Sequence, residues 1–158
     1  ACLCNKIVTI LYEKIICEKL PDIYSSAGLL HDIGTIVLLY NYRGKYADIL
    51  DKAINEGGIS LINMEIQTFS ASHQEIGGYL LNWWGLPQPI VESALFHHSP
   101  LDGRVKNKEL VSIVHIADIL SWKILGIDMS KTLDNNIFDL LGVSSDDCKK
   151  IVTEYKLV

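Results

Sequence analysis

Apolar side chains recur every three or four residues along most of the chain, and this spacing constrains the fold more than any other feature. In the opening segment the apolar positions are Leu3, Ile7, Ile10 and Leu11. This period places the apolar residues on one face of an α-helix. No segment has the convincing alternation of a half-buried strand, and the sequence contains no internal repeat. The sequence therefore predicts an all-α fold.

Proline, glycine and serine residues divide the chain into predicted helices. The first helix ends at Pro21, and Ser25 and Ser26 offer an N-cap for the second. Residues 41–44 should break the pattern after the second helix. The predicted helical segments are 3–20, 27–40, 46–56 with a C-cap at Gly57 and Gly58, 60–83, 88–98, 107–125, 138–141 and 146–155.

The composition fits one globular domain. A chain of 158 residues, 49% of them hydrophobic, is long enough to bury a core, so residues 1–158 are taken as a single domain. Because the chain begins inside a patterned segment, we expect it to be a fragment of a longer polypeptide. The 14 basic and 19 acidic residues give a net charge of -5 without long runs of either sign, which argues against nucleic acid as a partner.

The cysteines and apolar runs predict a cytoplasmic protein. Cys2, Cys4, Cys17 and Cys148 form no C-x-x-C pair, so we expect reduced thiols. No apolar run approaches the roughly 18 residues of a membrane span, and no basic-then-apolar leader opens the chain. We therefore expect no membrane partner.

An adjacent histidine and aspartate, His31 and Asp32, follow the apolar run 27–30. Their burial without partners would cost several kcal/mol, so they need hydrogen bonds or a metal ion. Gly34 and Gly77 would let neighbouring backbones approach closely. Other imidazoles and a carboxylate also lie at the ends of apolar helices or inside them: His73, His97, His98 and Asp118. Converging in a bundle, such ligands suit one divalent ion, Mn, Fe, Zn or Mg, that activates water for attack on a phosphoryl group.

These residues also have purely structural interpretations. His31 and Asp32 could form a hydrogen-bonded pair that joins two helices. His97 and His98 could be donors or cations at a helix C-terminus. We interpret His115, three residues before Asp118 on the same predicted helix, as structural.

The order of these motifs resembles the HD phosphohydrolase superfamily and, more closely, the HDOD domain, an HD-related output domain of bacterial signalling proteins. The resemblance spans about residues 3–155. It implies an HD-like helical bundle, and it implies that the family's usual N-terminal half is not in this chain. The residues that carry the HDOD likeness are Glu65, Phe69, His73, Gly77, Leu80, Leu81, Trp84, Leu86, Pro87, Ile90, His97, His98, Ser99 and Pro100.

The resemblance also implies metal ligands. In mononuclear HD enzymes the ligand positions correspond to His31, Asp32 and Asp118, and the multi-metal HD-GYP phosphodiesterases add positions that correspond to His73, His97 and His98.

Two departures from these patterns argue against catalysis. The first ligand histidine, about 27 residues before the His-Asp pair, is replaced by Cys4 and Asn5. Thr35 replaces the HD-GYP lysine, and no Gly-Tyr-Pro element follows His98. Loss of a ligand should weaken metal binding by at least the roughly 10- to 100-fold that loss of a supporting partner costs.

These observations favour a non-catalytic bacterial signal-transduction module with a degenerate HD metal site. Its partner would be a protein or another domain of the same signalling chain, and apolar surface left by the absent half would allow a homodimer. The alternative is a metal-dependent phosphohydrolase acting on a nucleotide or cyclic dinucleotide, with Asp32 as its catalytic residue. A third interpretation is a scaffold whose absent N-terminal half carries the interaction.

Overall fold

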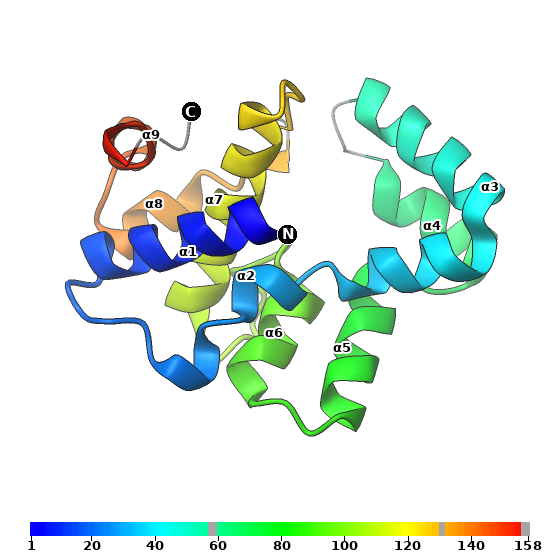
Figure 1. Ribbon diagram of the computed structural model, residues 1–158, viewed down its shortest axis with the longest axis horizontal. Helices are drawn as coiled ribbons and strands as arrows, with labels where there is room; N and C mark the ends of the chain where they lie inside the picture. Colours follow the sequence, from blue (N-terminus) through cyan, green and yellow to red (C-terminus); the bar gives the residue numbers. More distant parts are fainter. Residues whose placement is uncertain (57–59, 130–131, 156–158) are drawn as a thin grey trace.

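The computed structural model describes residues 1–56, 60–129 and 132–155, and this part of the chain contains helices and no strand (Figure 1). The all-α prediction is confirmed. The elements in chain order are α1 (Cys2–Ile15), the 3-10 turn η1 (Asp22–Tyr24), α2 (Ala27–Leu30), α3 (Ile33–Asn55), α4 (Leu61–Phe69), α5 (His73–Trp83), α6 (Gln88–Phe96), α7 (Lys108–Ile124), α8 (Asn136–Leu141) and α9 (Ser145–Glu154).

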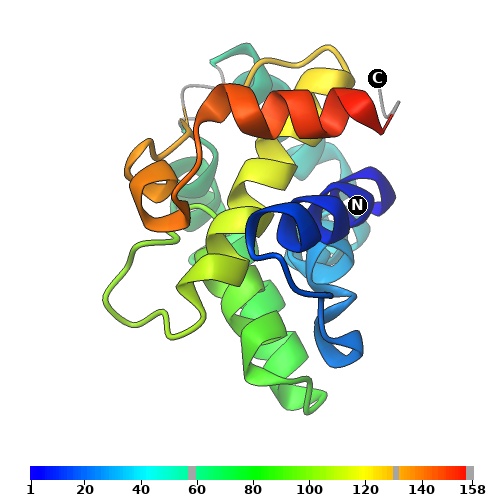
Figure 2. The same ribbon diagram turned by 90° about the vertical axis from the view of Figure 1, so that its left-hand side faces the viewer.

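Helix α7 forms the centre of the main hydrophobic core. Eleven of its 17 residues are buried, as expected of a helix that is covered on nearly all sides. Ile113, Val114 and Ala117 share one cluster with Ile7 and Leu11 of α1. In Figure 2, α7 (yellow) runs between α1 (blue) and α8 (orange). Each fully buried aliphatic side chain of this kind contributes about 1.5–3 kcal/mol, so the α1–α7 contact fixes this half of the molecule.

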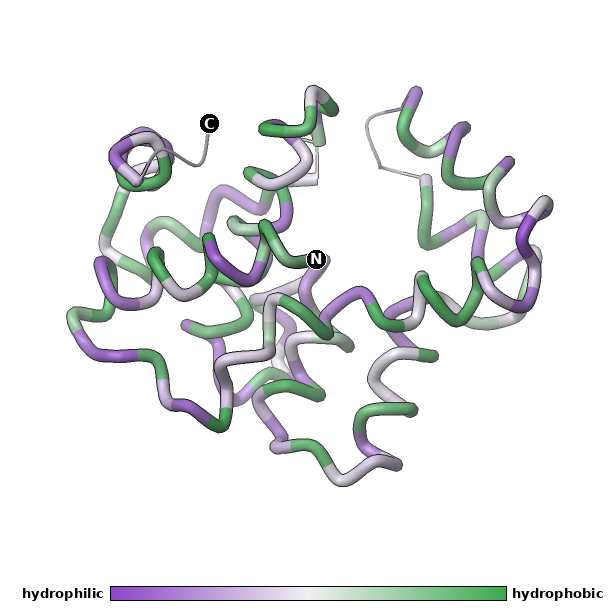
Figure 3. The backbone as a smooth tube through the Cα atoms, in the orientation of Figure 1, coloured by the Kyte–Doolittle hydropathy of each residue, from purple (hydrophilic) through white to green (hydrophobic). Residues whose placement is uncertain are grey.

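A second, smaller core holds α5 against α6. Its buried members are Leu81 of α5 and Ile90, Val91 and Ala94 of α6. Helices α3 and α4 extend from this side of the molecule (Figure 1). In Figure 3, hydrophobic and hydrophilic residues alternate along most helices, as burial on one side requires.

Three predicted helix boundaries differ from the structure. The first helix ends at Ile15 rather than near residue 20, and Cys17 adopts a positive φ of 59°. The segment 60–83 is two helices, because Ser70 adopts a left-handed conformation and Ser72 begins a new helix with a capping box. The predicted helix 27–40 is interrupted at His31 and Asp32, which separate α2 from α3.

The predicted break at residues 41–44 is a kink rather than an end. Helix α3 continues through it, with a single non-helical residue at Tyr42 (φ −130°, ψ 35°). The kink redirects the second half of α3 so that it lies beside α4 (Figure 1). The predicted C-cap at Gly57 and Gly58 lies outside the described residues.

One described stretch, Asp22–Asn55, is long and apolar enough to pass a test for a membrane-spanning helix based on length and composition. It is not one straight helix, because it contains η1, α2 and α3 and is interrupted at Asp32 and kinked at Tyr42. This arrangement is compatible with a soluble protein.

Candidate metal centre

The six residues predicted as metal ligands come together where α2, α3, α5, α6 and α7 meet. We call this group the centre. Its members are His31 and Asp32 between α2 and α3, His73 at the start of α5, His97 and His98 directly after α6, and Asp118 inside α7.

Local sequence fixes where His73 and His97 lie. Helix α5 begins at His73 because the Ser72 hydroxyl accepts a hydrogen bond from the Glu75 amide, while the Glu75 carboxylate accepts one from the Ser72 amide. Helix α6 has Pro89 in its first turn, where a missing N–H costs nothing, and ends so that His97 is its C-cap.

Asp32 lies between the two halves of the centre. Its Oδ2 is 3.5 Å from His31 Nε2, and its Oδ1 is 3.5 Å from His97 Nε2 and 3.7 Å from His73 Nε2. On the far side of His31, Asp118 Oδ1 is 3.4 Å from the same Nε2 atom. A carboxylate with one oxygen toward each histidine group has the arrangement of a bridging ligand.

Three histidine nitrogens converge on the other side of Asp32. His73 Nε2 lies 3.3 Å from His97 Nε2 and 3.2 Å from His98 Nε2. One ligand atom from each of the three residues lies within 4.8 Å of the others.

The opposite ring nitrogens are already engaged. His31 Nδ1 lies 3.0 Å from the Gly28 carbonyl, and His97 Nδ1 lies 3.0 Å from the Ala94 carbonyl. His73 Nδ1 lies 2.8 Å from the Glu65 carboxylate. Carbonyl and carboxylate oxygens only accept, so we assign the hydrogen to Nδ1 in each ring. The Nε2 lone pairs of neutral rings then face the centre.

Lone pairs that point at one another need a cation between them. His31 Nε2 is the clearest case, because this atom is buried, lies near two carboxylates and has no hydrogen bond of acceptable geometry. A proton or a metal ion would satisfy it. Imidazole nitrogens held through Nδ1 and combined with carboxylate oxygens are a donor set that divalent metals use, so the residues fit such an ion.

The electrostatics divide the histidines into two classes. Burial alone would lower the pKa of His31, but the charge of Asp32 and the contact with Asp118 outweigh it and raise the pKa to about 9. Burial also opposes protonation of His73, yet the hydrogen bond with Glu65 and the charge of Asp32 raise its pKa.

His97 and His98 show the opposite behaviour. Burial lowers the pKa of His97 despite its contact with Asp32. Burial and the neighbouring His97 and His73 hold the pKa of His98 well below its ordinary value. Without a metal, His31 and His73 therefore hold a proton more tightly than His97 and His98 do.

Glu65 is a supporting residue whose site role the sequence interpretation missed. Its side chain is fully buried on α4, where its Oε2 accepts a 2.9 Å hydrogen bond from the backbone N–H of His73. The Tyr46 hydroxyl donates to its other oxygen. A carboxylate that orients a ligand histidine raises its basicity and fixes its tautomer. A glutamate amid the apolar positions of a helix was the available signal.

Cys4 is a second residue that lies at the centre and was not among the predicted ligands. It is 1% exposed on α1, and it, His31 and Asp118 each offer a ligand atom within 4.8 Å of the other two. Burial, together with the negative charges of Asp118 and Asp32, raises the pKa of its thiol well above the ordinary value. His115 has backbone contacts instead: its Nδ1 is bonded to the His97 carbonyl, and its Nε2 accepts from the Asp134 N–H.

A cavity of about 190 Å³ reaches the centre. Its walls are mostly apolar and come from both halves of α3, the start of α4 and the end of α7. Its described lining residues are Asp32, Thr35, Leu39, Leu50, Ala53, Ile54, Leu61, His73, His98, Asp118, Trp122 and Met129.

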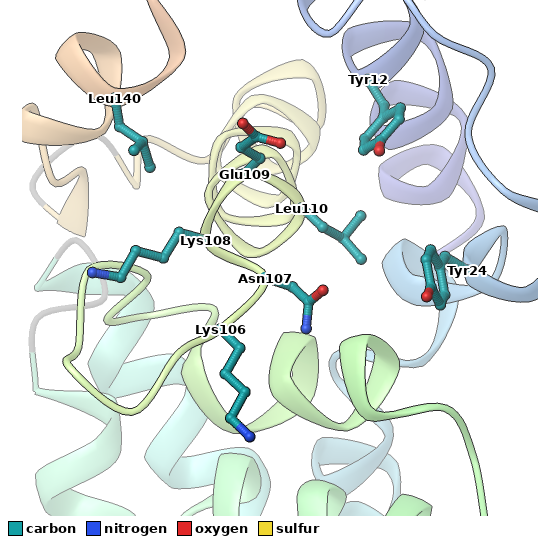
Figure 4. Close-up of a pocket in the computed structure, with 8 residues that line it drawn as sticks. All are labelled: Tyr12, Tyr24, Lys106, Asn107, Lys108, Glu109, Leu110 and Leu140. Carbon is teal, nitrogen blue, oxygen red and sulfur yellow. The ribbon is translucent and has the colours of Figure 1, made fainter.

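A larger cavity, of about 380 Å³, lies at the start of α7 and shares no lining residue with this one (Figure 4). It contains none of the predicted ligands. Its Asn107 side chain donates a 3.0 Å hydrogen bond to the carboxylate of Glu92, so this amide supports the loop before α7.

Comparisons with known proteins agree with the fold and the motifs. The chain is 30% identical over 95 residues to an uncharacterized protein of Treponema pallidum (strain Nichols), covering 58% of this chain and 18% of that protein. The crystal structure of an HDOD domain protein with unknown function from Geobacter sulfurreducens superposes with a TM-score of 0.71 at 23% identity, covering 98% of this chain and 55% of that one. The chain thus spans about a fifth of the length of the Treponema protein and little more than half of the Geobacter protein. The family model of the HDOD domain matches residues 1–100. This chain belongs to the HDOD domain family.

Proposed function

We propose that this domain is a non-catalytic regulatory module of a bacterial signalling protein, in which a divalent metal ion at the centre sets how the helices pack. The observation that carries the proposal is the cavity beside the centre. Its volume is about 190 Å³, and no lysine or arginine is among its described lining residues.

A phosphohydrolase would need more from this cavity. Pockets for small molecules usually measure roughly 300–1,000 Å³, so a nucleotide would not fit without opening α3 from α7. Phosphoryl transfer also relies on cations that clamp the phosphate oxygens. The position of the HD-GYP lysine is Thr35, which lines the cavity and has no charge.

The ligand positions support a regulatory role. They lie on segments that are far apart in the sequence, so a metal ion here would tie the α1–α7 core to the α5–α6 core. Asp32 is the link, because its two oxygens face His31 on one side and His97 on the other. Gain or loss of the ion would change the relative freedom of the two cores, and a partner could sense that change.

Exposed aromatic residues support a protein partner or another domain of the same chain. Tyr40 is 88% exposed, and Tyr79 and Trp83 of α5 are 74% and 73% exposed. Tyr79 and Trp83 lie one turn apart on the same face of α5, and adjoining exposed aromatic residues of this kind are typical of an interface. A second copy of the chain would also cover it, whereas the acidic net charge disfavours nucleic acid. We place the module in the cytoplasm, away from the membrane.

A metal-dependent phosphohydrolase is the second candidate. The bridging position of Asp32, between His31 and the three converging histidines, favours it, because two metals bridged by one carboxylate can activate water. In that case Asp32 would be the catalytic ligand, and His73, His97 and His98 would extend the metal site or contact phosphate.

Hydrogen exchange and hydrolysis assays together decide between the two. We expect Zn²⁺, Mn²⁺ or Fe²⁺ to slow amide exchange around residues 31–34, 73–77 and 97–98 in the purified domain, compared with the chelated protein. We expect no hydrolysis of bis-p-nitrophenyl phosphate or cyclic dinucleotides with any of these metals. Metal-dependent hydrolysis that disappears in Asp32→Ala would overturn the regulatory proposal, as would exchange rates that no metal changes.

A further inference from the structure

We propose that the Cys4 thiolate is a metal ligand and completes a Cys4–His31–Asp118 site that prefers a thiophilic ion such as Zn²⁺, Co²⁺ or Fe²⁺. This inference rests on the proposed metal at the centre, and it names the residue that replaces the histidine of HD enzymes. The three side chains come from α1, the α2–α3 junction and α7.

The geometry requires little movement. One ligand atom from each residue lies within 4.8 Å of the other two, and the burial of all three keeps them out of bulk water. Around tetrahedral Zn²⁺, with Zn–S near 2.3 Å and Zn–N near 2.1 Å, ligand atoms lie about 3.3–3.8 Å apart. A contraction of at most about 1–1.5 Å, within the reach of side-chain rotation, would therefore close the site.

A second observation points to a ligand between these groups. His31 is 1% exposed and its Nε2 has no hydrogen bond of acceptable geometry, while its Nδ1 is held by the Gly28 carbonyl. Nε2 therefore faces the space that Asp118 and Cys4 border. A metal–nitrogen bond would give this buried nitrogen a partner.

The approach of α1 to α2 supports the site. A Cβ on Gly28 would lie 2.8 Å from the Asn5 Cα and 2.7 Å from a Val8 methyl carbon. Because Gly28 has no side chain, α1 can pack close enough to bring Cys4 beside His31. Gly28 therefore has two roles: its carbonyl fixes the tautomer of His31, and its lack of a side chain lets Cys4 lie beside His31.

Coordination chemistry gives the metal preference. A thiolate favours Zn²⁺, Co²⁺ or Fe²⁺ over the oxygen-seeking Mg²⁺ and Mn²⁺. In the binding step the Cys4 S–H bond breaks, the proton leaves to solvent, and the sulfur lone pair forms the bond to the metal. No oxidant or reductant is needed.

Cys148 offers a matched comparison within the same core. It is 2% exposed, close to the value for Cys4, but it belongs to no potential metal-binding group among the described residues. If buried cysteines here were only small apolar side chains, the two would behave alike. If Cys4 is a ligand, only Cys4 will respond to a metal.

Cobalt spectroscopy on the whole domain tests the inference. Cys2 and Cys17 are exposed, so Cys2→Ser and Cys17→Ser form the parent background. We expect Co²⁺ to produce a thiolate-to-cobalt charge-transfer band in this parent and in Cys148→Ala. In Cys4→Ser the band should vanish, and Co²⁺ affinity should fall by at least about 10-fold. In Cys4→His the affinity should persist without the band.

The outcomes separate this inference from the proposed function. Stoichiometric Co²⁺ binding by the parent without a charge-transfer band would overturn the role of Cys4 and leave the metal centre intact. A band that survives in Cys4→Ser would overturn it as well. Failure of the parent to bind Co²⁺, Zn²⁺ or Mn²⁺ would overturn both. If Cys4→Ser does not fold, the spectra of the parent and of Cys148→Ala still decide whether Cys4 binds the ion.

Discussion

Replacement of Gly34 by alanine is the sharpest test of how the centre is supported. A Cβ at Gly34 of α3 would lie 1.9 Å from the carbonyl oxygen of His73 and 2.9 Å from the backbone nitrogen of Gly77, both in α5. The obstruction is backbone, so no side-chain rotation can relieve it. The close approach predicted for Gly34 and Gly77 from the sequence is therefore present, and it positions His73, a proposed ligand.

The expected energy follows from this distance. The methyl group would be about 1.5 Å closer than the 3.4 Å at which ordinary contact begins, so α5 must shift. Overpacking of this kind costs up to about 3 kcal/mol, and the better helix propensity of alanine offsets about 1 kcal/mol. We expect Gly34→Ala to lose about 2 kcal/mol of unfolding free energy, or about 4–8 °C in Tm for a domain of this size.

Alanine substitutions at two other glycines, Gly44 and Gly77, serve as comparisons for Gly34→Ala. A Cβ on Gly44, further along α3, would meet nothing within 4 Å, so Gly44→Ala should stabilise the domain by up to about 1 kcal/mol. A Cβ on Gly77 would lie 3.2 Å from the Gly34 nitrogen, so Gly77→Ala should be nearly neutral.

Urea denaturation followed by tryptophan fluorescence, with Co²⁺ titration of each variant, provides the measurement. Gly34→Ala should lose metal affinity as well as stability, because the shift moves His73. Equal stability of Gly34→Ala and Gly44→Ala would refute the close approach of α3 and α5. Lost stability with unchanged metal affinity would refute the claim that this approach positions His73.

Three further experiments test the supports of the centre. Glu65→Gln removes the charge that orients His73, so metal affinity should fall about 10- to 100-fold in competition with a chromophoric chelator, and unchanged affinity would contradict the role of Glu65. In the chelated domain, the pKa of His31 is about 9 when folded and 6.5 when unfolded, so its stabilisation is complete below pH 6.5 and is lost as the pH rises through about 9. That change is at most about 3–4 kcal/mol, and urea unfolding free energies that stay constant between pH 6.5 and 9 would rule it out. Ser72→Ala and Ser144→Ala each remove a capping box and should each lower the unfolding free energy, measured by urea denaturation, by about 1 kcal/mol. Only Ser72→Ala, next to His73, should also weaken metal binding. An equal effect of both variants on metal affinity would count against a role of the Ser72 cap in positioning His73.

The sequence predicted the helical class and most helix positions because apolar spacing reports local geometry. It failed where a helix ends without glycine or proline. Ser70 ends α4 in a left-handed conformation that few non-glycine residues adopt. Asp32 is the N-cap of α3, so it interrupts the helix predicted over residues 27–40. The loop-like sequence of residues 41–44 predicted the end of a helix, but the structure has only a kink at Tyr42, and α3 continues beyond it. In each case the tertiary packing determines the backbone conformation.

The site was predictable in part for the same reason. Histidines and aspartates stand out from apolar helices, so the six members of the centre could be named in advance. Glu65 and Cys4 could not be assigned roles, because their importance depends on contacts between helices that are distant in the sequence. Cys4 in particular occupies a position of α1 that suits any small apolar side chain.

The pairing of α1 with α7 also has a consequence for biosynthesis. About 90 residues separate the end of α1 from the start of α7, and Ile7, Val8 and Leu11 bury themselves largely against that later helix. At translation rates of about 5–20 residues per second, the apolar face of α1 waits roughly 5–20 s for its partner. During that interval the nascent chain presents an uncovered apolar face to chaperones, and the core closes only after α7 has been synthesised.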